Sequence, residues 1–182
     1  DVWISESDDA LEALLEKERG RKLFLTDIDG TLLNDAKELT DGNRRELERI
    51  LREGHAVCLS TGRTLKSALY QAGRIGLMQD GCYVISYNGG QIYDIGKKKV
   101  LFSASVPNDL VRLCFDKAHA LGVNIQAYTA EDVLVERDHP DVARYCAVQN
   151  LTSRLVDDVT NAELQGDPVS LEIRERFGVC YA

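Results

Sequence analysis

Short apolar runs and amphipathic segments alternate through the first half of the chain. Residues 23–25 and 55–59 are apolar runs of strand length, and residues 40–53 between them carry apolar side chains at helical spacing before Gly54. This pattern predicts a strand, a helix and a second strand. Because the helix returns the chain across the sheet, the two strands are expected to be parallel, with their carboxyl ends at one edge.

The alternation continues after residue 60. It predicts a helix over residues 64–72, a third strand over 82–87, and a hairpin that pairs 91–93 with 100–102. The order of elements places the chain in the α/β class. The elements predicted after the hairpin are a helix over 107–122, strands at 123–128 and 133–135, a short helix at 141–147 and a strand at 169–173.

The first twenty residues form an acidic segment before the first strand. Leu11, Leu14 and Leu15 fall on one helical face there. We therefore expect residues 1–20 to be a helical N-terminal extension that packs on the core or on a partner.

Composition and charge limit the classes of partner. A hydrophobic fraction of 44% over 182 residues is enough for a sizeable core. The formal net charge is −8 at pH 7, and Lys97 to Lys99 is an isolated basic run. Neither nucleic acid nor an anionic membrane is an expected partner, because the chain offers no basic field to hold one.

The cysteines indicate a reducing compartment. Cys58, Cys82, Cys114, Cys146 and Cys180 are odd in number and contain no Cys-x-x-Cys pair. They are expected to be reduced core residues, neither zinc ligands nor a disulfide framework. The sequence contains no signal peptide and no apolar run of membrane length, so a cytoplasmic location is expected.

Two carboxylates follow the first predicted strand. Period-two alternation places Asp27 and Asp29 on one side and turns Ile28 into apolar packing. Two like charges this close favour a neutralising cation, and Mg²⁺ prefers oxygen ligands. Gly30 permits a tight turn, and Thr31 offers a hydroxyl and an N–H group to an anion. The alternative is an ordinary aspartate-rich turn with no ligand.

The second predicted strand ends in Ser60-Thr61-Gly62-Arg63, beside the two aspartates. Hydroxyl groups, a glycine N–H and the start of the next helix together form a corner suited to an anion. Capping of that helix by Ser60 or Thr61 would explain the hydroxyls without a substrate. Arg63 is equally compatible with a structural role, and Asn88 after the third strand is better explained as a residue that shapes its loop.

These strings resemble the motifs of one enzyme family. Asp27 to Leu32 resembles the first motif, Asp-x-Asp-Gly-Thr-Leu, of the haloacid dehalogenase superfamily of phosphohydrolases. Residues 60–63 resemble its second motif in the form typical of Cof-type phosphatases (subfamily IIB), which also have a Tyr-Asn-Gly stretch like the one at Asn88. The resemblance implies that Asp27 is the nucleophile, forming a transient aspartyl phosphate, and that Asp29 is the general acid and base.

The resemblance also implies a fold, a cofactor and a substrate class. It implies a Rossmann-like core over residues 21–103 and a partial α+β cap module over 104–182. The expected reaction is Mg²⁺-dependent hydrolysis of a small phosphorylated metabolite, such as a sugar phosphate. The metal positions would be Asp27 and Asp29, the latter through its backbone carbonyl. The residues expected to bind substrate and phosphate are Gly30, Thr31, Thr61, Gly62, Arg63 and Asn88.

The chain departs from the family pattern after the expected cap module. Cof-type proteins then supply a lysine and a Gly-Asp-x-x-Asn-Asp segment, and neither is found in this sequence. Two hypotheses therefore stay open: a phosphatase whose C-terminal core is missing from this sequence, and a non-catalytic binding or interaction module. A phosphomutase is a further alternative, because related enzymes form the same aspartyl phosphate. The oligomeric state is not predicted.

Overall fold

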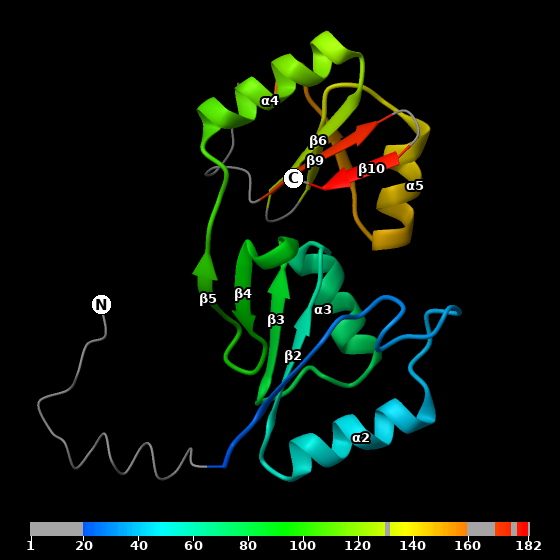
Figure 1. Ribbon diagram of the computed structural model, residues 1–182, viewed down its shortest axis with the longest axis vertical. Helices are drawn as coiled ribbons and strands as arrows, with labels where there is room; N and C mark the ends of the chain where they lie inside the picture. The colour runs from blue at the N-terminus through cyan, green and yellow to red at the C-terminus, as the bar shows by residue number, and fades with distance from the viewer. Residues whose placement is uncertain (1–19, 130–131, 160–169, 176–177, 182) are drawn as a thin grey trace, which may run out of the picture.

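The computed structural model describes residues 20–129, 132–159, 170–175 and 178–181. The predicted N-terminal extension therefore lies outside the described residues, apart from Gly20. The chain forms two α/β units, each built on its own five-stranded sheet (Figure 1). The predicted α/β class is confirmed.

The first sheet combines parallel strands with a hairpin. Strands β1 to β3 are parallel neighbours, and β4 and β5 continue the sheet in antiparallel orientation. The three predicted strands and the predicted hairpin are thus confirmed. The bounds are β1 Leu23–Thr26, β2 Ala56–Ser60, β3 Cys82–Ser86, β4 Gln91–Asp94 and β5 Lys99–Ser103.

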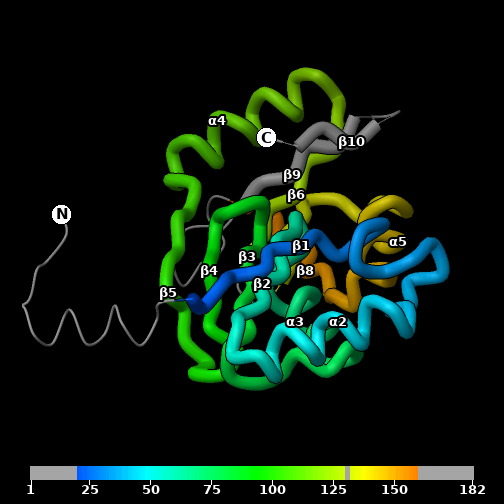
Figure 2. The backbone as a smooth tube through the Cα atoms, turned by 60° about the horizontal axis from the view of Figure 1, so that its bottom comes forward, coloured from blue at the N-terminus to red at the C-terminus, as the bar shows by residue number. Residues whose placement is uncertain are grey.

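Two helices, α2 (Asp41–Arg52) and α3 (Leu65–Arg74), cover one face of the first sheet (Figure 2). Their inward side chains meet alternate strand residues in a buried apolar cluster. The predicted helix over 40–53 is confirmed, with Thr40 as its N-terminal capping residue. The cluster includes Ile28, Leu47, Val57, Leu59, Ala68, Ala72 and Val84.

Strand β1 forms one edge of the described sheet. The side chains of Leu23, Phe24 and Leu25 are 52%, 44% and 52% exposed. An open groove follows the face opposite the helices. Its lining includes Cys58, Tyr83, Ile85, Ile92 and Leu101.

The second unit contains the remaining elements. Its sheet has the order β10-β9-β6-β7-β8 and is antiparallel except for the β7–β8 pair. The helices and strands predicted for this part of the chain are confirmed, but two short strands, β8 and β10, had no clear sequence pattern. In the first unit, a 3₁₀ turn, η1 (Tyr87–Gly89), follows β3. The bounds are α4 Asn108–Leu121, β6 Asn124–Tyr128, β7 Val133–Val135, α5 Pro140–Gln149, β8 Ser153–Leu155, β9 Ser170–Glu175 and β10 Gly178–Tyr181.

An apolar cluster joins the two units. Tyr87, in the turn after β3, packs edge-on against Tyr128 at the end of β6, with ring centroids 6.3 Å apart. The Tyr87 hydroxyl donates a hydrogen bond to the carbonyl of Thr129 at 3.3 Å. Buried side chains of β7 and α5, among them Val142 and Cys146, complete the cluster. The second unit is therefore docked on the strand ends of the first sheet.

The structure describes the side chains of four of the five cysteines, and these four are free thiols. Cys58, Cys82 and Cys146 are buried, as expected for core residues, and Cys114 is partly buried. Burial raises the pKa of the Cys58 and Cys82 thiols to about 11. Among the described residues, none of the helices combines the length and apolar character needed to span a membrane.

Helix α3 is capped by Thr64. Its hydroxyl accepts a hydrogen bond from the N–H of Ser67 at 3.2 Å. The alternative that Ser60 or Thr61 caps this helix is therefore wrong, because α3 begins at Leu65, beyond the reach of either residue.

We expect Thr64→Ala to lower the free energy of unfolding by about 1 kcal/mol, because the Ser67 N–H would lose its acceptor. Urea denaturation measures the difference. The control is Ser60→Ala, which removes a hydroxyl that does not cap the helix. Equal losses in both variants would contradict the assignment of the cap.

Candidate active site

Three loops meet where the parallel strands of the first sheet end. Residues 27–31 follow β1, residues 61–63 follow β2, and η1 follows β3. These ends face the second unit (Figure 1). Backbone hydrogen bonds join two of the loops, from the N–H of Asn88 to the carbonyl of Thr61 at 3.2 Å and from the N–H of Tyr87 to the carbonyl of Arg63 at 2.9 Å. The structure thus gathers all the predicted site residues at one edge.

Asp27 presents an exposed carboxylate at this edge. Its backbone carbonyl accepts hydrogen bonds from the Thr26 hydroxyl at 2.9 Å and from the N–H of Leu32 at 3.3 Å. No described residue donates a hydrogen bond to its side chain. Ile28 is fully buried in the core cluster, as the alternation predicted. The backbone of Asp27 is therefore fixed while its carboxylate stays accessible.

Asp29 is held by two cations. Arg63 donates from Nε to Oδ2 at 2.7 Å and from Nη2 to Oδ1 at 2.8 Å, and Lys37 Nζ donates to Oδ1 at 2.9 Å. The Arg63 hydrogen bonds and, to a smaller extent, the Lys37 contact outweigh the effect of burial and lower the pKa of Asp29 from 3.8 to about 2. Asp29 is consequently ionised at neutral pH in this arrangement.

The Arg63 side chain is buried, with 5% of its surface exposed. It occupies both carboxylate oxygens of Asp29 with two parallel hydrogen bonds, which is the strongest geometry available to this pair. Its remaining terminal nitrogen, Nη1, donates to Ser67 Oγ and to Gln149 Oε1. The side chain thus links the loop after β1, helix α3 and helix α5.

Thr61 and Gly62 shape the loop between β2 and α3. The Thr61 hydroxyl is buried and accepts a hydrogen bond from the N–H of Arg63 at 3.2 Å. A hydroxyl that accepts in this way can still donate its hydrogen to an anion. A Cβ atom on Gly62 would lie 2.8 Å from Oδ1 of Asn88, so only glycine permits the observed approach of the Asn88 side chain.

The predicted turn after β1 is also present. Gly30 adopts φ 80°, a conformation that favours glycine. Thr31 beside it is exposed. In the next loop, Asn88 adopts φ 54° in η1, consistent with the expected role of shaping that loop.

Sequence reasoning missed Lys37 and Gln149. Lys37 lies in a loop eight positions after Asp29, where neither periodicity nor spacing marks it. Gln149 lies 86 positions after Arg63, beyond the end of the predicted short helix at 141–147. No local pattern could have identified either residue.

The oxygen atoms at this edge provide only some of the ligands that a hard cation such as Mg²⁺ needs. The Asp27 carboxylate is exposed and supplies the oxygen chemistry that Mg²⁺ prefers. The Asp29 carboxylate is occupied by Arg63 and Lys37, which leaves its backbone carbonyl as the candidate ligand. Within the described segments, no three His, Cys, Asp or Glu side chains gather at one point. Residues 27 and 29 therefore offer part of a magnesium site.

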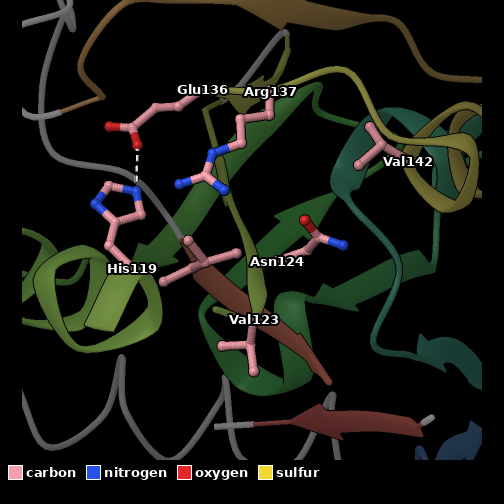
Figure 3. Close-up of a pocket in the computed structure, with 7 residues that line it drawn as sticks. His119, Val123, Asn124, Glu136, Arg137 and Val142 are labelled. Atoms are coloured by element: carbon pink, nitrogen blue, oxygen red, sulfur yellow. Dashed lines mark ion pairs between the residues drawn. The ribbon is translucent and has the colours of Figure 1, made fainter. Parts of the chain in front are cut away.

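A small cavity lies in the second unit, lined by residues that include His119, Asn124 and Glu136 (Figure 3). There His119 Nε2 and Glu136 Oε2 form an ion pair at 2.6 Å, and the N–H of Val159 donates to Glu136 Oε1. The cavity volume of about 20 Å³ suits roughly one water molecule. These contacts join α4 to the residue that follows β7.

Comparison with known proteins identifies the family of this chain. Residues 24–171 match the haloacid dehalogenase-like hydrolase family. Over 115 residues the chain is 30% identical to the 5-amino-6-(5-phospho-D-ribitylamino)uracil phosphatase YitU of Bacillus subtilis (strain 168), covering 61% of this chain and 41% of YitU. The corresponding phosphatase YcsE of the same organism is 31% identical over 116 residues, covering 62% and 43%.

A solved structure shares the fold. The crystal structure of a haloacid dehalogenase-like hydrolase from Bacteroides thetaiotaomicron matches with a TM-score of 0.74 and 25% identity, over 84% of this chain and 57% of that one. The chain spans only 35% of the length of one curated relative and 55% of another.

We expect Gly62→Ala to displace the Asn88 side chain while the fold is retained, because the new methyl group meets the mobile end of that side chain. The side-chain amide signals of Asn88 in an NMR spectrum measure the displacement. The control is Gly42→Ala, where the nearest atom is 4.0 Å away. Unchanged Asn88 signals in Gly62→Ala would disprove the close approach.

The lowered pKa predicts a pH-dependent contribution of Asp29 to stability. The carboxylate favours folding above its unfolded pKa near 3.8, and this contribution is lost as the pH falls towards about 2. Lowering the pKa from 3.8 to about 2 corresponds to about 2–3 kcal/mol, and solvent screening of this partly exposed carboxylate reduces that value. At pH 7 we therefore expect Asp29→Asn to lower the free energy of unfolding by roughly 1–2 kcal/mol.

Denaturation at several pH values measures this contribution. The difference between wild type and Asp29→Asn should shrink below pH 4. The control is Asp35→Asn, at an exposed position in the same loop region. A difference that stays constant from pH 7 to pH 2 would show that Asp29 is not held by its cations.

Proposed function

The chain belongs to the haloacid dehalogenase-like hydrolase family, and from this premise we propose that it hydrolyses small phosphate monoesters with Mg²⁺. One observation carries the proposal. An accessible carboxylate without a partner among the described residues, Asp27, lies two positions from an ion-paired carboxylate, Asp29, where the parallel strands end. Binding sites in open α/β sheets lie at such strand ends.

Asp27 is the proposed nucleophile. One of its carboxylate oxygens attacks phosphorus, the bond from phosphorus to the ester oxygen breaks, and an aspartyl phosphate forms. Water then attacks phosphorus, and inorganic phosphate leaves as the bond to Asp27 breaks. The exposure of the carboxylate supports this role, because a nucleophile held in ion pairs would be less available.

Asp29 is the proposed acid and base. It gives a proton to the leaving alkoxide in the first step and takes one from water in the second. The ionised form that Arg63 and Lys37 favour is the form needed in the second step. The first step requires a protonated Asp29, so at least one of these contacts must loosen when substrate binds.

The surrounding loops are proposed to hold the phosphoryl group. Gly30, Thr31 and Gly62 offer backbone N–H groups, and the Thr61 hydroxyl can donate. Arg63 and Lys37 add positive charge beside the reacting carboxylates. Preorganised donors and charges of this kind supply much of the catalysis in phosphoryl transfer. Asn88 completes this edge of the site through its approach to Gly62.

Mg²⁺ would be held by the Asp27 carboxylate and the Asp29 backbone carbonyl. It would neutralise the charge that builds up between Asp27 and the phosphate. Asp27 itself positions its oxygen towards solvent at the strand end, and its fixed backbone limits the directions from which it can attack.

The second unit is proposed to act as a cap. It is docked over the strand ends through the Tyr87–Tyr128 contact, where it would exclude water and select the leaving group. The names of YitU and YcsE specify a phosphorylated ribityl compound as their substrate. A sugar phosphate or a similar small ester is therefore the proposed substrate class for this chain.

A non-catalytic role is the second candidate. It is favoured by the incomplete set of metal ligands within the described residues. The intact pair Asp27 and Asp29, together with the Thr61 to Arg63 loop, favours catalysis instead. A phosphomutase would use the same aspartyl phosphate and is distinguished by its products.

We expect the 182-residue chain to hydrolyse an aryl phosphate or a member of a sugar-phosphate panel with Mg²⁺ and not with EDTA. Asp27→Asn should lower kcat at least about a thousandfold, as loss of a nucleophile does in other covalent enzymes. Release of inorganic phosphate measures the rate.

The matched control is Asp35→Asn, which removes an exposed carboxylate near the site and should leave kcat unchanged. Undiminished turnover in Asp27→Asn would remove Asp27 from the nucleophile role. A folded chain that releases no phosphate from any of these esters would favour the non-catalytic role. Transfer of phosphate between two positions of one sugar would indicate a mutase.

A further inference from the structure

One hydrogen-bonding group in the site comes from the second unit. Gln149, the last residue of α5, accepts through Oε1 a hydrogen bond of 2.8 Å from Nη1 of Arg63. The other two donating nitrogens of Arg63 are both engaged by Asp29. A single guanidinium group therefore connects Asp29 of the first unit with Gln149 of the second.

Ser67 completes this connection from helix α3. Its hydroxyl is fully buried, accepts a hydrogen bond from Arg63 Nη1 at 2.9 Å and donates to Gln149 Oε1 at 2.9 Å. The Gln149 oxygen thus receives two hydrogen bonds, both from the first unit. Because Ser67 lies on a helix of the core, these contacts fix the guanidinium plane from two sides.

The position of Gln149 depends on how the second unit is docked. Helix α5 ends at this residue, because Asn150 adopts the left-handed conformation with φ 55°. Earlier in α5, Val142 and Cys146 pack in the cluster that contains Tyr87 of the first unit. The Gln149 oxygen therefore reaches Arg63 only when this cluster is assembled.

We propose that Gln149 is a positioning residue that orients Arg63 against Asp29 when the second unit is docked on the first. The proposal rests on the proposed function, in which Asp29 is the acid and base. The orientation of Arg63 against this carboxylate then depends on Gln149 of the second unit, a residue that does not touch the reacting atoms.

The chemistry of the side chain fits this role. An amide oxygen can orient a guanidinium group without neutralising it, so Arg63 keeps its full charge for Asp29 and for an anionic substrate. When the second unit moves away, Arg63 loses one acceptor, and Ser67 loses the acceptor of its hydroxyl. Docking and undocking thereby change how firmly the guanidinium is held.

The test follows the Arg63 guanidinium by NMR in the whole chain, with the signals assigned from Arg63→Lys. We expect the Nη1 protons to exchange with solvent about tenfold faster in Gln149→Met, the factor that corresponds to losing one hydrogen bond of a charged group. Methionine has similar length and volume but lacks the amide oxygen. Gln149→Glu keeps an oxygen at this position and should restore slow exchange.

The control is Val148→Ala, at the neighbouring exposed position of the same helix, which should leave the exchange unchanged. Equal acceleration in the control would show a general effect of α5 stability and overturn the proposal. Slow exchange in Gln149→Met, or failure of Gln149→Glu to restore it, would overturn it as well. If Gln149→Met does not fold, Gln149→Ala at the same half-buried position replaces it.

The measurement uses neither substrate nor metal. Its outcome is therefore independent of the hydrolysis assay. A chain that releases no phosphate can still show slow exchange of the Arg63 protons, and an active chain can show fast exchange.

Discussion

The ion pair between Arg63 and Asp29 joins parts of the chain that lie far apart in sequence. Its two short hydrogen bonds tie the loop after β1 to the loop after β2, and the third nitrogen of Arg63 extends the contact to α3 and α5. Burial of the guanidinium requires such a set of acceptors, because an unpaired buried charge is costly. The shape of the strand-end site depends on this requirement.

The ion pair also separates the properties of the two aspartates. Asp29 is surrounded by donors and holds its charge, while Asp27 is exposed and lacks a partner among the described residues. The buried Ile28 between them keeps both carboxylates on one side of the backbone. One short stretch thus supplies an accessible carboxylate and a cation-bound one, the two side chains to which the proposed mechanism gives different roles.

Docking of the second unit adds a condition on this site. The tyrosine contact and the apolar cluster around it hold the second unit over the strand ends, and Gln149 then reaches Arg63. The apolar contacts stabilise docking but do not depend on a precise orientation of the second unit. The hydrogen bonds to Gln149 do, because they require a defined distance and angle.

The sequence by itself determined most of the elements and the place of the two aspartates at a strand end. Apolar periodicity predicted β1 to β3, α2 and α4, because burial of one face leaves a regular pattern, and Asp27, Asp29 and the loop at Thr61 were marked by their place after strands. Strand β8 left no such pattern, because its three residues are all exposed.

Only the tertiary structure decided that Thr64 caps α3, and that Lys37 and Gln149 meet Asp29 and Arg63. Contacts between side chains distant in sequence depend on how elements pack, and local spacing does not encode that packing.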